Sequence, residues 1–388
     1  MPWRYGGNGP PAFTFAGPPD SMVQRAVILR GCFRILLLYD VAEALDLDKL
    51  RELLGPRGGT VKRVFPRGTP EYVRFEHAPI VEPAQAIDLG TGERILCSIK
   101  YYAFAVVVVQ LETPFECDWE SLLRQASRWT DTVNVEPYAR ELVRQHLERL
   151  APSVIRPVKD WLQEDYLVIN LEQVQRPEGP LSGTELLAAH GQKIAQLVRG
   201  ELTPLAPGVT EEILQSSISY YASDLVVAGA SASLVYDRGE DAAATNQVLE
   251  YAKMQLLEFR YYDGLMSQLL SDVYTALERR RNVLLSRWSV PRDAKRFNTI
   301  RLDVMDLTER IDNAIKFVSD IYYARLYRLA ATRMGVPDYR SLVDEKLRTV
   351  GELYDVMVDQ FNEARSFIVE FAIAILALLD VILLLRIK

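Results

Sequence analysis

Two segments, SIKYYAFAVVV at residues 98–108 and SISYYASDLVV at residues 217–227, are identical at seven of eleven positions. Each joins a pair of tyrosines to β-branched residues, a composition typical of strands. Similar strand and helix patterns flank both segments in the same order. The sequence therefore predicts an internal duplication of an α+β unit, of the ferredoxin-like type; chance similarity between two valine-rich strands is the alternative.

Outward from these segments, the pattern predicts further elements in both units. Residues 26–40 are expected to form a strand, and residues 41–55 a helix that ends at Gly55. In the second unit, Ser182 or Thr184 is expected to cap a helix. The expected fold class is α+β, with duplicated ferredoxin-like units, then a long antiparallel coiled-coil helical arm and a C-terminal transmembrane helix. The expected parts are a disordered Gly/Pro-rich leader at 1–22, α+β units at 23–156 and 157–243, the arm at 244–365 and the transmembrane helix at 366–386.

Heptad spacing indicates the helical arm. In the second of three expected helices, apolar residues follow alternating steps of four and three, a pattern typical of coiled coils. Gly335 and Pro337 are expected to end this helix. The apolar positions are Ile300, Val304, Leu307, Ile311, Ala314, Val318 and Ile321.

The tail, FAIAILALLDVILLLRIK at residues 371–388, has the length and apolarity of a membrane span. A buried core helix is the alternative. Glu370, Ala374, Ala377 and Asp380 share one stripe of this helix, which predicts contact between subunits within the membrane. An ion or proton path, or no specific role, are the alternatives for these four residues.

A basic segment between residues 279 and 301 holds eight Lys or Arg and one acid. Its side chains are expected at lipid headgroups, with a solvated helix tip as the alternative. The positive-inside tendency then places the N-terminal body in the cytoplasm of a bacterium, anchored to the inner membrane, or on the matrix side of a mitochondrial inner membrane. The headgroup residues are Arg279, Arg280, Arg281, Lys295 and Arg296.

Composition argues against several functions. The net charge of −7 makes the whole chain a poor polyanion binder, so an anionic partner needs a local basic patch, and DNA is not expected as a partner. His77, His146 and His190 lack metal-ligand spacing, and no phosphate loop or nucleophile motif is present. The sequence therefore predicts no cofactor, no metal, no catalytic residue and no enzymatic activity.

The run SYYASDLVVAGASASLVYD at 219–237, the helix LEYAKMQLLEFRYYDGLMSQLL at 249–270 and the step Val369-Glu370-Phe371 resemble the required-for-meiotic-nuclear-division family. The resemblance covers roughly residues 95–388. It implies a membrane-anchored, oligomer-forming protein without known catalysis, whose mitochondrial members support organellar translation. This chain lacks a transit-peptide pattern, which favours a bacterial inner membrane.

Two main functions follow as expectations. The first is a tail-anchored, homo-oligomeric membrane scaffold or tether that presents α+β domains on the cytoplasmic side. Its partners would be further copies of itself, membrane lipids, and a ribosome or another membrane-associated protein. The second is a membrane-tethered RNA- or ribosome-binding factor, in which Tyr101, Tyr102, Tyr220 and Tyr221 stack on bases. An enzyme with an unrecognised site is a third possibility.

Overall fold

The structure is a computed structural model of the 388-residue chain. It describes residues 27–60, 79–88, 94–132, 135–175, 179–279, 299, 302, 304–305, 321–353, 355, 370 and 373–377.

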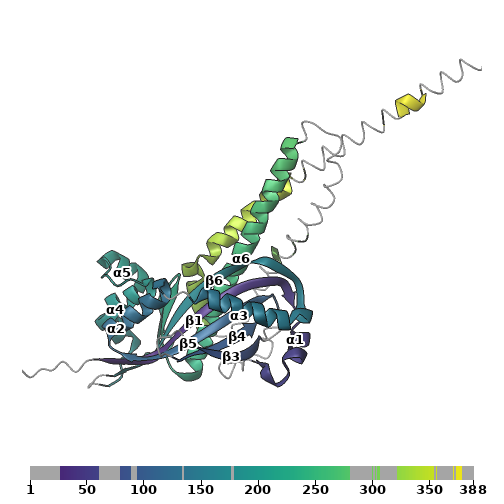
Figure 1. The fold of residues 1–388 in the computed structure, drawn as a ribbon. Helices are drawn as coiled ribbons and strands as arrows, with labels where there is room; N and C mark the ends of the chain where they lie inside the picture. Colours follow the sequence, from purple (N-terminus) through teal and green to yellow (C-terminus); the bar gives the residue numbers. More distant parts are fainter. Residues whose placement is uncertain are drawn as a thin grey trace, which may run out of the picture.

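A mixed sheet of nine strands forms the centre of the fold (Figure 1). Its spatial order is β2-β3-β4-β5-β1-β6-β9-β8-β7, and β6 and β9 form the parallel pair. The remaining neighbours are antiparallel. The strands are β1 Ile28–Leu45, β2 Gly59–Thr60, β3 Ile80–Asp88, β4 Arg94–Tyr101, β5 Val106–Cys117, β6 Val154–Gln175, β7 Ser217–Ile218, β8 Leu225–Ala228 and β9 Ala232–Tyr236.

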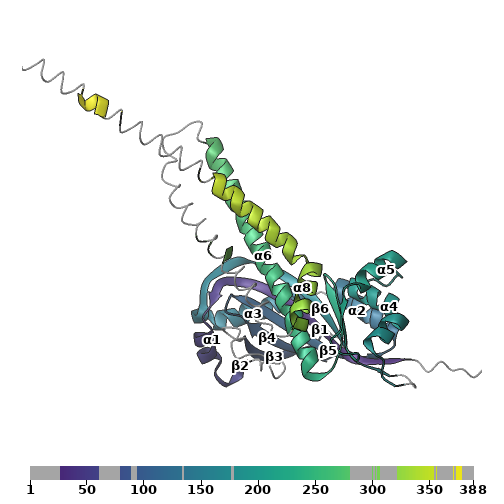
Figure 2. The ribbon, with the colours of Figure 1, turned by 180° about the vertical axis from the view of Figure 1, so that it is seen from behind.

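Helices cover both faces of the sheet, so the fold is α+β in three layers. Helices α1 to α4 contribute to the core on one face, and α6 and α8 contribute to the core on the other. Figures 1 and 2 show α6 extending beyond the sheet with α8 beside it. The helices are α1 Leu47–Leu54, α2 Trp119–Ser127, α3 Glu136–Arg149, α4 Gly183–Arg199, α5 Pro207–Leu214, α6 Gly239–Arg279 and α8 Ile321–Met334. Residues 336–353 are also helical.

Strand β1 shows how the sequence divides the two cores. Phe33 and Leu37 face the core under α1 to α4, whereas Leu36 and Leu38 face the core under α6. Because neighbouring strand residues point to opposite faces, a run that is apolar at every position is buried on both sides. This is why residues 35–39 read as a continuous apolar run.

Gly31 permits the close approach of β6 to β1. A methyl group at this position would lie 2.0 Å from the backbone oxygen of Asn170 and 2.7 Å from the ring of Phe115. The register of the β1–β6 pair also shifts between Arg30 and Gly31. A residue without a side chain is therefore required where the two longest strands meet.

The expected helix at 41–55 differs from the structure at its start. Strand β1 continues to Leu45, because Ala42 and Leu45 pair with Pro157 and Val154 of β6. Helix α1 begins only after Asp46, whose side chain accepts a hydrogen bond from the backbone of Lys49, and it ends at Gly55. Residues 41–45 therefore pair in the sheet, although their sequence has the periodicity of a helix.

The two similar segments both form hairpins. Residues 98–108 form the β4–β5 hairpin, and residues 217–227 form the β7–β8 hairpin. Strands from both expected units belong to one sheet, because β1 of the first unit pairs with β6 of the second. The expected pair of ferredoxin-like units is therefore wrong, because the strands form one nine-stranded sheet. Whether the two similar segments arose by duplication stays a prediction.

The expected coiled-coil arm is wrong. Leu256 and Phe259 of α6 pack in the same core as Tyr166 of the sheet. The apolar stripe of α6 therefore packs against the sheet as well as against another helix. Ile321, expected at a buried heptad position, is 75% exposed. Most of the other expected positions in its helix, from Ile300 to Val318, lie outside the described residues.

The membrane assignment is also corrected. Among the described residues, no helix combines the length and the apolarity that a bilayer crossing requires. Of the expected span, the structure describes Glu370 and residues 373–377, which are helical. The expected transmembrane helix at 366–386, the tail anchor and the inner-membrane location are therefore wrong.

Candidate functional site

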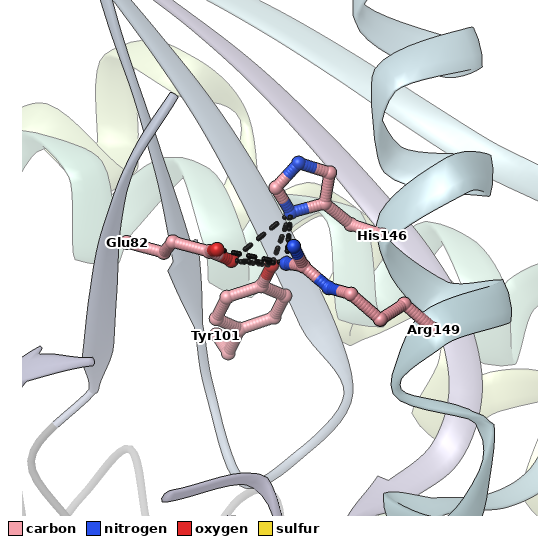
Figure 3. Close-up of polar contacts among 4 residues, drawn as sticks. All are labelled: Glu82, Tyr101, His146 and Arg149. Carbon is pink, nitrogen blue, oxygen red and sulfur yellow. Dashed lines mark hydrogen bonds and ion pairs between the residues drawn. The ribbon is translucent and has the colours of Figure 1, made fainter. Parts of the chain in front are cut away.

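Four polar side chains meet where the last turns of α3 lie against strands β3 and β4 (Figure 3). Glu82 of β3 accepts hydrogen bonds from the hydroxyl of Tyr101, at 3.1 Å, and from the guanidinium of Arg149, at 2.8 Å to each carboxylate oxygen. Nδ1 of His146 lies 3.0 Å from both Glu82 and Tyr101. We call these four residues the Glu82 cluster.

Burial sets the charge states in the Glu82 cluster. Burial is the main cause that lowers the pKa of His146, with Arg149 acting in the same direction and Glu82 against it. Burial and the neighbouring Glu82 carboxylate raise the pKa of Tyr101. The cluster is therefore built from a carboxylate, a guanidinium, a neutral phenol and an imidazole that favours its neutral form.

The contacts within the Glu82 cluster hold α3 against the sheet, and we call this arrangement a clamp. Both oxygens of Glu82 are engaged by Arg149, and the Tyr101 hydroxyl and Nδ1 of His146 lie against the same carboxylate. A substrate would have to displace one of these contacts to reach the carboxylate. The four residues join the last turn of α3 to the sheet, and the structural role expected for His146 stays a prediction.

A second group of buried charges lies between α6 and the sheet. Glu250 of α6 accepts from Lys100 Nζ at 2.5 Å and from the Tyr102 hydroxyl at 2.8 Å. Glu164 of β6 forms ion pairs with Lys253, at 2.6 Å, and with Arg260, both from α6. Burial lowers the pKa of Lys253 to about 8. These pairs fix the rotation of α6 on the sheet.

Asp40 gives this region a pH dependence. Burial raises the pKa of Asp40 to about 7, whereas the unfolded value is about 3.9. The folded chain therefore binds more protons between these two values, so stability falls as pH rises through that window.

Asp40→Asn is expected to stabilise the chain at pH 8 by about 2–4 kcal/mol, since one pKa unit corresponds to about 1.4 kcal/mol. A smaller gain is expected at pH 5, where Asp40 of the folded parent is protonated. Urea unfolding at both pH values measures this difference, with the exposed Asp48→Asn as the control. An equal gain at both pH values would show that the titration of Asp40 is not the cause.

Helix α8 carries an open hollow of about 540 Å³ on its outer side. Its lining residues, which we call the arginine surface, are Arg325, Arg328, Leu329, Thr332 and Arg333. They recur at steps of three and four, so they form one stripe of the helix. The opposite face of α8, including Leu326 and Ala330, is buried in the core with α6.

The positive charge of this surface is largely uncompensated within the described residues. Arg333 reaches Glu212 of α5, with Nη1 3.5 Å from the carboxylate. Arg325 and Arg328 are exposed, and no carboxylate of the described chain forms an ion pair with either of them. Two guanidinium groups are thus presented to solvent on one helical stripe.

An exposed pair of aromatic rings adjoins the start of α8. Tyr220 and Tyr221, the tyrosine turn, precede β8 and are 52% and 59% exposed. The ring of Tyr220 lies 5.1 Å from the ring of Tyr322, centroid to centroid. Tyr322 is one helical turn before Arg325, so the tyrosine turn lies at the end of the arginine surface.

The residues expected from the sequence are only partly described. Arg279 is the last described residue of α6, whereas Arg280, Arg281, Lys295, Arg296 and Asp380 lie outside the described residues. Glu370, Ala374 and Ala377 are helical and exposed. Their expected contacts with lipid or with another subunit stay predictions, although the membrane helix on which they were based is withdrawn.

The tyrosines expected to stack on bases and the three histidines lie in different surroundings. Tyr101 is buried in the Glu82 cluster and Tyr102 bonds Glu250, so neither presents a ring for stacking on a base. His190 stacks on Trp119, with 4.6 Å between ring centroids, and His77 lies outside the described residues. Within the described chain, no group of three or more His, Cys, Asp or Glu is placed to hold a metal.

The arginine surface was missed although the sequence contains a signal for it. Between Asp320 and Asp338 there are three arginines and no acidic residue. The basic segment at 279–301 has a higher density of Lys and Arg and is the stronger sequence signal. The heptad register predicts a buried position for Ile321, which precedes Tyr322 in the chain. For this reason the spacing alone does not place Tyr322 on the same stripe as the arginines.

Comparison with known proteins identifies a family for the part of the chain that contains the sheet. Residues 30–242 match the family described as uncharacterized protein MJ0711, N-terminal domain. Uncharacterized protein MJ0711 of Methanocaldococcus jannaschii is 23% identical over 190 residues, which are 49% of this chain and 58% of that protein. No solved structure matches the chain.

The family match extends from β1 to the first residues of α6 and covers more than half of the chain. The resemblance to the required-for-meiotic-nuclear-division family is therefore wrong. It relied on a valine-rich run at 219–237 and an amphipathic helix, which the structure shows to be the turn and hairpin around β8 and β9, followed by α6 packed on the sheet. That arrangement reflects general packing rules and does not identify a family.

Proposed function

The chain belongs to the family of the MJ0711 N-terminal domain, and we propose that it is a non-catalytic binding protein whose arginine surface holds an anionic partner. The observation that carries the proposal is the stripe of Arg325, Arg328 and Arg333 around one open hollow. Guanidinium groups bind phosphate and carboxylate oxygens through paired hydrogen bonds. The stripe is about 16 Å long from Tyr322 to Arg333 at 1.5 Å per residue, which suits an extended anion.

The acidic balance of the chain supports a local site over a diffuse one. With a net charge of −7, most of the surface repels polyanions. A partner would therefore be held where positive charge is concentrated, and binding would weaken steeply as salt screens it.

The absence of catalysis is part of the proposal, and the Glu82 cluster supports it. Its titratable groups resemble catalytic ones in kind, but they are engaged with one another in the clamp described above. Among the described residues that line it, the arginine surface offers Thr332 and guanidinium groups, without a carboxylate or imidazole to move a proton. Binding is the action that this set of side chains supports. Self-association of the chain stays a prediction.

Reversing two charges tests the proposal. The variant Arg325→Glu/Arg328→Glu is expected to bind inorganic polyphosphate at least tenfold more weakly than the parent, a loss of about 1.4 kcal/mol or more. Competition against a labelled polyphosphate at low and moderate salt measures the affinity, and the salt dependence of the variant should be shallower.

The matched control is Arg51→Glu/Arg348→Glu. Both residues are exposed, lie on other helices and give the same change in net charge. The control should bind polyphosphate within about twofold to threefold of the parent, because long-range charge effects are screened beyond about 10 Å. Equal losses in the two double variants would contradict a local site on α8.

A further inference from the structure

The tyrosine turn gives the arginine surface a second kind of contact. Tyr220 packs edge-on against both Tyr221 and Tyr322, at 4.6 and 5.1 Å between ring centroids. Tyr220 and Tyr221 remain 52% and 59% exposed. Tyr322, which contacts Tyr220, lies one helical turn before Arg325, so these exposed aromatic residues adjoin the arginine surface.

Hydrogen bonds hold the tyrosine turn in place. The two carboxylate oxygens of Asp224 accept from the backbone N–H groups of Tyr220 and Tyr221, each at 2.8 Å. Asp224 is itself buried, and its backbone oxygen would lie 2.3 Å from a methyl group at Gly183, the first residue of α4. The turn is therefore packed against α4, so the rings need little ordering when a ligand arrives.

From this juxtaposition we infer that the anionic partner is a single-stranded polynucleotide, whose phosphates lie on the arginine surface while a base stacks on the tyrosine turn. The inference rests on the proposed function and names its ligand. An acidic peptide would use the arginines alone. A duplex keeps its bases stacked on one another, so it could not use the rings, whereas an unpaired base has a face available to aromatic side chains.

Two probes separate the charge contribution from the stacking contribution. Labelled oligouridine and labelled polyphosphate are titrated into the full chain and followed by fluorescence anisotropy, with oligothymidine and duplex RNA as further ligands. Oligouridine and oligothymidine both offer phosphates and an unpaired pyrimidine, and they differ in the sugar 2′-hydroxyl and in the C5 methyl group of the base. Tighter binding of either single strand than of the duplex, at equal phosphate concentration, is expected.

The variant Tyr220→Ala/Tyr221→Ala is expected to bind the preferred single strand at least fivefold more weakly, since base stacking on an aromatic ring contributes about 1–3 kcal/mol. Its affinity for polyphosphate should stay within about twofold of the parent because the arginines are unchanged. Tyr220→Phe/Tyr221→Phe keeps both rings and should restore single-strand binding. Tyr221→Ala alone, which leaves the Tyr220–Tyr322 contact in place, should lose part of the affinity.

The outcomes distinguish the two proposals. If the charge reversal at Arg325 and Arg328 weakens both probes while the alanine variants change neither, the polynucleotide inference is overturned and the anion-binding function stands. If the charge reversal changes neither probe, the proposed function itself fails. The inference would also be overturned if Tyr221→Ala and the double alanine variant lost as much affinity for polyphosphate as for the single strand. Stacking affects only a ligand that has bases.

Discussion

Replacing Glu82 with alanine is expected to lower the free energy of unfolding by about 3–5 kcal/mol, because the Tyr101 hydroxyl and the His146 imidazole lose their buried partner at about 1–3 kcal/mol each. Glu82 is 3% exposed, and its carboxylate is the common partner of Tyr101, His146 and Arg149. Alanine would remove the acceptor of the buried Tyr101 hydroxyl and the carboxylate that lies against Nδ1 of His146. It would also leave a cavity between α3 and the sheet.

Equilibrium unfolding in urea measures this loss. The control is Glu116→Ala, which removes an ion pair with Arg30 in which both side chains are about half exposed. Such surface pairs contribute about 0–1 kcal/mol. A loss below 1 kcal/mol for Glu82→Ala, or a loss equal to that of the control, would contradict the role of the Glu82 cluster as the clamp of α3.

The second large effect is expected for Glu164→Ala, again about 3–5 kcal/mol. Glu164 and Lys253 are 8% and 7% exposed in their side chains and form an ion pair at 2.6 Å. Removing the carboxylate leaves the ammonium group of Lys253 buried without this partner, in a setting whose burial already lowers its pKa to about 8. The change therefore weakens the attachment of α6 to the sheet.

A double variant separates this mechanism from simple loss of packing. Glu164→Met/Lys253→Met replaces both buried charges with apolar side chains of similar length and should recover at least half of the lost stability, since such replacements are often neutral. Glu352→Ala, in an exposed pair with Arg348, provides the surface control. If the double variant is less stable than Glu164→Ala, unpaired charge is not the cause of the loss.

Local signals in the sequence predicted several elements of the fold. The helix ending at Gly55 is present because a glycine there adopts a φ of 53°. Ser182 caps α4 in a reciprocal arrangement with Glu185, as its position before the helix indicated. These features depend on residues close together in the chain, so a single sequence contains the information for them.

Long-range pairing could not be predicted in the same way. Ala42 belongs to β1 because β6 lies beside it, more than a hundred residues later in the chain. The Glu82 cluster joins residues 64 and 67 positions apart, and no periodicity connects them. An apolar stripe on a helix likewise shows that one face is buried, without saying whether a sheet or another helix covers it. This ambiguity led to the expected coiled-coil arm.

Arginine footprinting tests most directly whether α8 presents an anion-binding surface. Phenylglyoxal modifies accessible guanidinium groups, and mass spectrometry of the digested chain reports the extent at each arginine. With polyphosphate or oligouridine bound, Arg325 and Arg328 should be protected, while Arg51 and Arg348 should react as they do in the free chain. Unchanged reactivity at Arg325 and Arg328 under conditions where the ligand is bound would contradict the claim.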